Sequence, residues 1–135
     1  MFTLDPQLEA DTLPVTDMRL CTVRLMNDAN YPWAILVPQR GEMADLIDLE
    51  PADRATLALE ADAVSRALKS LTGCHKLNVA ALGNVVRQLH VHVIARFEHD
   101  PAWPAPVWGK VAAKPYSGVE GETFAAELAA AIREH

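Results

Sequence analysis

The sequence predicts an α+β domain in which an antiparallel sheet packs against one long helix and a C-terminal helix. Two strand-like runs, residues 20–27 and 33–38, are separated by a short turn, which is typical of a β-hairpin. Residues 51–71 carry apolar side chains at spacings of three and four, the pattern of an amphipathic helix. Because further strands follow this helix as a group, the order favours helices gathered on one side of a sheet.

Cap and turn residues mark the elements of the first half of the chain. Asp5 and Pro6 are typical of an N-cap and a first helical residue, and they predict a short helix over residues 5–10. Residues 28–32, Asp-Ala-Asn-Tyr-Pro, have turn chemistry, and Pro38 closes the second strand of the hairpin. A short helix followed by a hairpin is therefore expected.

The second half begins with the long helix. Pro51 suits its first turn and Gly73 its C-cap, so this helix is expected over about residues 51–71. Two strands are expected after it, over residues 76–81 and 86–96.

The last third of the chain contains an irregular segment followed by a helix. Residues 100–109 are rich in Pro and Trp, which excludes a regular helix or a central strand because proline lacks a backbone donor. An Ala-rich helix is expected over residues 122–133. No linker divides the chain, so residues 1–135 are expected to form a single domain.

Bulk composition excludes several classes of function. Half of the residues are hydrophobic and 22% are charged, as in a globular protein. No apolar run approaches the roughly 20 residues that a membrane span needs. The net charge of −6 argues against binding nucleic acid or an anionic membrane surface, but it leaves room for a small anionic ligand.

The first residues and the cysteines suggest a cytoplasmic protein. The first residues, Met-Phe-Thr-Leu-Asp-Pro, lack the basic and apolar regions of a signal peptide. Cys21 and Cys74 lie far apart and match no metal-binding spacing. We therefore expect free thiols in a reducing compartment.

The most informative stretch is Gln-Leu-His-Val-His-Val-Ile-Ala-Arg at residues 88–96. On a strand, side chains alternate between faces with a period of two. Gln88, His90 and His92 would then share one face, and the apolar residues between them would face the core. Two imidazoles and an amide side by side form a polar site suited to anions, protons or a metal.

Three hypotheses fit a bare His-x-His pair. In the first, His90 attacks phosphorus and His92 aids the leaving group or binds a phosphate oxygen, near backbone N–H groups of the turn at residues 83–86. In the second, the pair binds zinc or another divalent ion, with Glu98, His99 or Asp100 as the local candidates for a third ligand. In the third, both histidines are structural and lie at a dimer edge.

The flanking residues favour the first hypothesis. Residues 78–96 resemble the signature of the histidine triad (HIT) superfamily of nucleotide hydrolases and transferases, in which an Asn and a Gly precede three histidines that alternate with apolar residues. Asn78, Gly83, His90 and His92 match that pattern. Residues 33–38, Trp-Ala-Ile-Leu-Val-Pro, also resemble the family's strand that ends in proline.

The resemblance implies a HIT-like fold, a homodimer and a reaction on nucleoside phosphate derivatives such as dinucleoside polyphosphates or nucleoside phosphoramidates. By it, His90 is the nucleophile that forms a nucleotidyl-histidine intermediate, and His92 contacts the phosphate and helps the leaving group. No cofactor or metal is implied for the attack. The residues implied to contact the nucleotide, its phosphate or its ribose are Asn78, Gly83, Asn84, the backbone N–H of Val85, and Asn27 or Asp28.

The sequence departs from the family at one catalytic position. Gln88 stands where the first histidine of the triad belongs, a residue that supports the site and does not attack. Glutamine can donate and accept hydrogen bonds but does not titrate near neutral pH. A non-catalytic nucleotide-binding protein is therefore the alternative to an enzyme.

Three tryptophans have two interpretations each. Trp103 and Trp108 lie in the Pro-rich stretch, where they would either stack on a nucleobase or pin the loop to the core. Trp33 stands where many family members carry histidine, and it is expected in the core or in a pocket wall.

Overall fold

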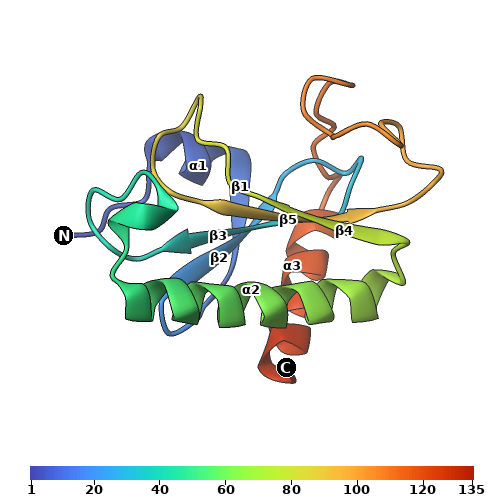
Figure 1. The fold of residues 1–135 in the computed structure, drawn as a ribbon. Helices are drawn as coiled ribbons and strands as arrows, with labels where there is room; N and C mark the ends of the chain where they lie inside the picture. Colours follow the sequence, from blue (N-terminus) through green and yellow to red (C-terminus); the bar gives the residue numbers. More distant parts are fainter.

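The computed structural model describes residues 1–135, and its centre is a five-stranded antiparallel sheet with the strand order β1-β2-β3-β5-β4 (Figure 1). The α+β prediction is confirmed. The elements in chain order are α1 (Pro6–Asp11), β1 (Thr12–Asp17), β2 (Cys21–Met26), β3 (Trp33–Pro38), the 3-10 turn η1 (Leu46–Asp48), α2 (Pro51–Thr72), β4 (Lys76–Ala80), β5 (Val91–Arg96) and α3 (Glu120–Arg133).

The two faces of the sheet are covered differently. Helices α2 and α3 lie on one face, whereas α1, the loop before β5 and the segment after β5 lie on the other (Figure 1). The helix-covered face holds the larger core, in which Val91, Val93 and Ala95 of β5 meet Val64 and Leu68 of α2. Alternation along β5 therefore sends its odd-numbered residues into this core and its even-numbered residues to the other face.

The helices and the hairpin follow their sequence signals closely. Helix α2 begins at Pro51 and ends at Thr72, and Gly73 closes it in the left-handed conformation with φ of 63°. Asp5 caps α1 by accepting the backbone N–H of Gln7 at 2.8 Å. Strands β2 and β3 pair antiparallel, so the predicted hairpin is confirmed.

Strand β1 has no counterpart among the predicted elements. It lies at one edge of the sheet beside β2, and its pairing shifts register between Pro14 and Thr16. Proline is tolerated in an edge strand or at a bulge because no ladder hydrogen bond is lost there. Pro14 also explains why the sequence predicts no strand here, because proline is unfavourable inside a sheet.

The strand predicted over residues 86–96 is shorter than expected. It begins at Val91, so Gln88 and His90 lie in the preceding loop. The neighbouring strands explain the difference, because the pairing of β3 with β5 stops at Leu36 opposite Val91, and β4 ends at Ala80 opposite His92. Beyond them the backbone turns away, and Leu89 N donates to the carbonyl of Met43 at 2.8 Å.

Both cysteines are free, as expected, and both are buried. Burial first, and then the carboxylate of Glu60, raise the pKa of the Cys21 thiol well above its ordinary value. The helices of this fold are too short or too polar to cross a bilayer.

Candidate functional site

The two histidines of the His-x-His motif lie side by side where the loop before β5 joins the sheet. Their ring centroids are 4.8 Å apart and the planes are inclined by 71°. His92 is on β5 between Ile35 of β3 and Ala80 of β4, so the centre of the sheet fixes its backbone. Both residues are buried, with 7% and 4% of their surface exposed for His90 and His92 respectively.

A backbone carbonyl orients His90. Its Nδ1 lies 2.6 Å from the carbonyl oxygen of Gln88. Because a carbonyl oxygen only accepts hydrogen bonds, Nδ1 of the neutral ring carries the proton and donates it. The lone pair is then on Nε2, the nitrogen on the opposite side of the ring, which is the state required of a nucleophile.

An indole orients His92. Trp33 donates from Nε1 to Nδ1 of His92 at 2.9 Å. The ring of Trp108 meets that of His92 edge to face at a centroid distance of 5.1 Å. Burial first, and then the neighbouring His90, lower the pKa of His92 to about 4.

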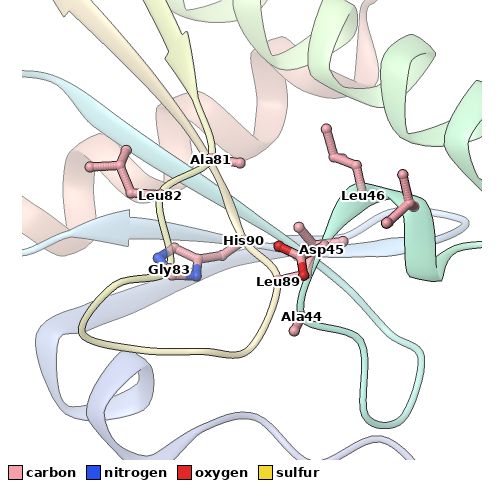
Figure 2. Close-up of a pocket in the computed structure, with 9 residues that line it drawn as sticks. Ala44, Asp45, Leu46, Ala81, Leu82, Gly83, Leu89 and His90 are labelled. Atoms are coloured by element: carbon pink, nitrogen blue, oxygen red, sulfur yellow. The ribbon is translucent and has the colours of Figure 1, made fainter.

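Two cavities meet at His90. The first has a volume of about 310 Å³ and contains both histidines, Trp33 and Trp108 in its wall. The second has a volume of about 300 Å³ and lies between the loop before β5 and the segment around η1. Figure 2 shows His90 and Gly83 on one side of the second cavity and Asp45 and Leu46 on the other.

The first cavity gathers several residues expected from the sequence. Gly83, Asn84, Val85 and Trp108 line it together with the two histidines. Gly83 has φ of 78°, in the region that favours glycine, and the residues that follow it line the same cavity as the histidines. Trp103, in contrast, lies outside this cavity, where its ring meets His75 edge to face and the guanidinium of Arg96 lies over it.

Helix α1 also contributes residues that sequence reasoning did not single out. Gln7, Leu8 and Asp11 line the first cavity, and Gln7 donates to both carboxylate oxygens of Asp11 at 2.9 Å. Nothing local in the sequence marks these residues, because α1 reaches the histidines only through the tertiary fold.

The side chain of Gln88 is turned away from the two imidazoles. It accepts the backbone N–H of Asp5 at 2.9 Å and donates to the carbonyl of Thr3 at 2.8 Å. The expectation that Gln88 shares one strand face with His90 and His92 is therefore wrong for Gln88, because the strand begins only at Val91. Gln88 instead ties the segment before α1 to the loop that carries His90.

Asn78 belongs to a separate polar cluster. Its Oδ1 accepts from Nη1 of Arg96 at 2.8 Å. Arg96 is 1% exposed, and its guanidinium forms a two-pronged ion pair with Asp100 at 2.8 and 3.1 Å. Hydrogen bonds from the backbone of Phe97, Ala102 and Trp103 complete the shell of Asp100.

Asn27 and Asp28 do not line the cavity with the histidines either. Asn27 Oδ1 accepts the backbone N–H of Tyr116 at 2.9 Å, and Asp28 Oδ1 accepts that of Lys114 at 3.2 Å. Both side chains hold the segment that leads into α3.

The residues around His90 and His92 do not form a three-ligand metal site. No three His, Cys, Asp or Glu side chains are grouped so that they could hold a metal ion. Among the candidates for a third ligand, Asp100 is bound to Arg96, and Glu98 lies 3.8 Å from His75.

Comparison with known proteins places this chain in a family. The HIT domain model matches residues 7–99, which is more than half of the chain. Among proteins with curated descriptions, none matches.

Three solved structures are similar over nearly their whole length. A histidine triad protein from Sinorhizobium meliloti 1021 is 51% identical, with 99% of this chain and 96% of that chain covered and a TM-score of 0.92. One from Bradyrhizobium japonicum is 45% identical, with 98% and 96% covered and a TM-score of 0.91. One from Marinobacter aquaeolei VT8 is 42% identical, with 99% and 98% covered and a TM-score of 0.95. The chain therefore belongs to the histidine triad (HIT) family.

Proposed function

We propose that this protein is a nucleotide hydrolase or transferase that acts on nucleoside phosphate derivatives through a nucleotidyl-histidine intermediate on His90. The observation that carries the proposal is the hydrogen bond from Nδ1 of His90 to the carbonyl of Gln88. It leaves the Nε2 lone pair free beside a second imidazole, in a cavity that has room for part of a nucleotide.

The proposed reaction has two steps at one phosphorus atom. Nε2 of His90 attacks and the bond to the leaving group breaks, after which water hydrolyses the N–P bond. The Nε2 atom of His92 contacts the phosphoryl oxygens or the leaving group, because its ring lies beside that of His90. No metal or cofactor takes part in the proposed attack.

The walls of the first cavity suggest how a nucleotide would be held. Trp108 is partly exposed and offers an aromatic face or edge to a base. Residues 83–85 line the same cavity, and we propose that their backbone N–H groups bind phosphate oxygens. We further propose that the carboxylate of Asp11, held by Gln7, accepts sugar hydroxyls. Asn27, Asp28 and Asn78 would then act indirectly, through the segments that they hold.

The alternative is a protein that binds nucleotides without turning them over. Gln88 stands where we expect the first histidine of the family's triad, and its side chain bonds to residues 3 and 5. The cavity therefore contains two imidazoles and no third titratable ring. This observation favours binding without catalysis only if attack at His90 needs that ring.

We also propose a homodimer. Val79 on the edge strand β4 and Leu59 on α2 are 54% and 69% exposed, and an exposed strand edge is a common pairing surface. Light scattering after size exclusion measures the mass directly, and a monomer at working concentration would contradict this part.

Turnover of a substrate panel tests the proposed function. Dinucleoside polyphosphates and nucleoside phosphoramidates are offered to the wild-type protein, to His90→Ala and to the matched control His99→Ala, whose histidine is exposed. We expect turnover by the wild type and the control, and none by His90→Ala. Equal rates for all three proteins would refute a role for His90, and nucleotide binding without any turnover would support the alternative.

A further inference from the structure

The hydrogen bond from Trp33 to His92 joins two side chains that the sheet holds rigidly. Trp33 on β3 pairs with Ile94 on β5. The side chain of Trp33 is therefore the diagonal neighbour of that of His92, on the same face of the sheet. Both side chains are buried. Edge contacts from Tyr31 and Trp108, at centroid distances of 6.2 and 5.8 Å, fix the indole in its place.

This bond determines which nitrogen of His92 carries the proton. An indole N–H donates and never accepts, so Nδ1 of His92 must keep its lone pair and the ring proton is on Nε2. Protonating Nδ1 would set two N–H groups against each other at hydrogen-bond distance. Burial and the neighbouring His90 act in the same direction, because they lower the pKa of His92 to about 4. Near neutral pH, His92 is thus an uncharged ring with a donor at Nε2.

No charged group contacts His92 in a way that would favour its protonated form. Ile35 and Ala80, its partners on the two neighbouring strands, are apolar. The titratable group in direct contact with it is His90. Other titratable groups on this face include Asp11 in the cavity wall, Tyr31 beside Trp33, Arg24 bonded to Thr12, and Arg96 bonded to Asp100.

We propose that Trp33 is a positioning residue that keeps His92 a neutral N–H donor and thereby restricts the enzyme to leaving groups that depart without a proton. This inference rests on the proposed function. In the first step the lone pair of His90 Nε2 forms the N–P bond, the P–O bond breaks, and its electron pair goes to the leaving oxygen. In the second step water breaks the N–P bond, the lone pair returns to His90, and one proton goes to solvent.

The substrate class follows from the ability of His92 to donate a hydrogen bond and its inability to transfer a proton. Its Nε2–H stabilises negative charge on an oxygen, but transferring that proton would leave an imidazolate, so His92 is no general acid. A phosphate or polyphosphate oxygen is stable as an anion near neutral pH and needs no proton. An amine needs one to depart. Nucleoside polyphosphates are therefore the favoured substrates over nucleoside phosphoramidates.

Nitrogen NMR of the histidine rings tests the tautomer without any turnover. We expect His92 of the wild-type protein to show a protonated Nε2 and a bare Nδ1 from neutral pH down to about pH 5. Trp33→Phe removes the donor but keeps an aromatic ring, and we expect the pKa of His92 to rise by about one unit. Trp108→Phe is the matched control, since Trp108 lies equally near without a hydrogen bond to His92, and it should keep the wild-type tautomer. A wild-type His92 with its proton on Nδ1, or charged at neutral pH, would overturn the proposal even if no variant folds.

Kinetics test the consequence for substrates. With one nucleoside in both substrates, we expect kcat/KM of the wild type to favour the polyphosphate by roughly 10²-fold, the scale of a missing general acid. In Trp33→Phe the relative activity on the phosphoramidate should rise as the pH falls, by about tenfold. Equal activity on both substrates, or a preference for the amine leaving group, would refute the restriction. If neither substrate turns over, the proposed function fails, and the NMR result still decides the state of His92.

Discussion

Two polar clusters lie on the same face of β5, separated by Ile94, and they are built in opposite ways. At one end, the guanidinium of Arg96 is enclosed by Asp100, Asn78 and a backbone carbonyl. At the other end, His90 and His92 each use only Nδ1 for a hydrogen bond within the protein. Buried polar groups are normally satisfied internally. The Arg96 cluster meets that expectation and stabilises the fold, whereas the Nε2 atoms of the two histidines have no hydrogen-bond partner within the protein.

The contrast between the two clusters is tested most strongly by removing the unbonded Nε2 atom of His90. His90→Gln deletes the proposed nucleophile and keeps a polar side chain of similar size. We expect turnover to fall by at least about 10³-fold, as for loss of a covalent nucleophile. The free energy of unfolding in urea should change little, since His90 makes one hydrogen bond within the protein. A large loss of stability with retained turnover would mean that His90 stabilises the fold and does not act in catalysis.

Removing the cation of the other cluster should have the opposite outcome. Arg96→Met leaves Asp100 buried without its partner, with side chains that are 2% and 3% exposed in the native pair. We expect a loss of about 3–5 kcal/mol in the free energy of unfolding, the cost of an uncompensated buried charge. Turnover per folded molecule should stay near that of the wild type. A stable, inactive Arg96→Met protein would place Arg96 in the catalytic site.

The two clusters should lower the free energy of unfolding of the protein in separate ranges of acid pH. His92 has its pKa lowered from 6.5 to about 4, so the unfolded chain binds its proton first and stability falls as pH drops from 6.5 towards 4. Burial alone would raise the pKa of Asp100, but hydrogen bonds from Arg96 and from backbone N–H groups outweigh it and lower the pKa to about 2. Its contribution, on the order of 2 kcal/mol, is present at pH values well above 3.8 and is lost as pH falls from 3.8 through 2.

Urea titrations across pH measure these two ranges. His92→Gln should flatten the dependence between pH 6.5 and 4 and leave the lower range in place. If the variant and the wild type lose stability in parallel across both ranges, the assignment of the upper range to His92 is wrong.

The wall of the histidine cavity should control binding. Trp108→Ala removes the ring that meets His92 at 5.1 Å and that we propose to contact the base. We expect KM to rise by roughly 5- to 150-fold, the value of one stacked base, with a smaller change in kcat. Trp103→Ala is the matched control outside the cavity, and it should leave KM unchanged.

The smallest effect is expected at Gln88. Gln88→Ala removes two hydrogen bonds to the segment before α1, and we expect about 1–2 kcal/mol of destabilisation. Because this side chain does not reach the imidazoles, the pH dependence of kcat should stay as in the wild type. A changed pH profile would mean that Gln88 acts on the chemistry directly.

Local signals predicted most of the fold. The periodicity of residues 51–71 and the cap at Gly73 located α2 to within one residue, because those signals belong to the element itself. Strand β1 is not predicted because Pro14 is compatible only with an edge strand or a bulge, and both depend on how the whole sheet is paired. The sequence predicts a strand from residue 86, whereas β5 begins at Val91, because strand ends depend on where neighbouring strands stop.

The site was predictable where the chain itself brings residues together. His90, His92 and the turn at residues 83–85 are near in sequence and line one cavity. The bond from Trp33 and the cavity wall from α1 depend on strand register and on helix docking, which no local pattern encodes. The same holds for Asn78 and Asp28, whose amide and carboxylate types suit a ligand as well as they suit the internal bonds found here.

Intact-protein mass spectrometry tests the central claim most directly. The wild-type protein, His90→Ala and His92→Ala are each mixed with a slowly reacting nucleoside polyphosphate and quenched at short times. We predict an added mass of one nucleotidyl group on the wild type, located at His90 by peptide fragmentation and absent from His90→Ala. Turnover of the same substrate with no adduct at any time, or an adduct that persists in His90→Ala, would contradict a nucleotidyl-histidine intermediate on His90.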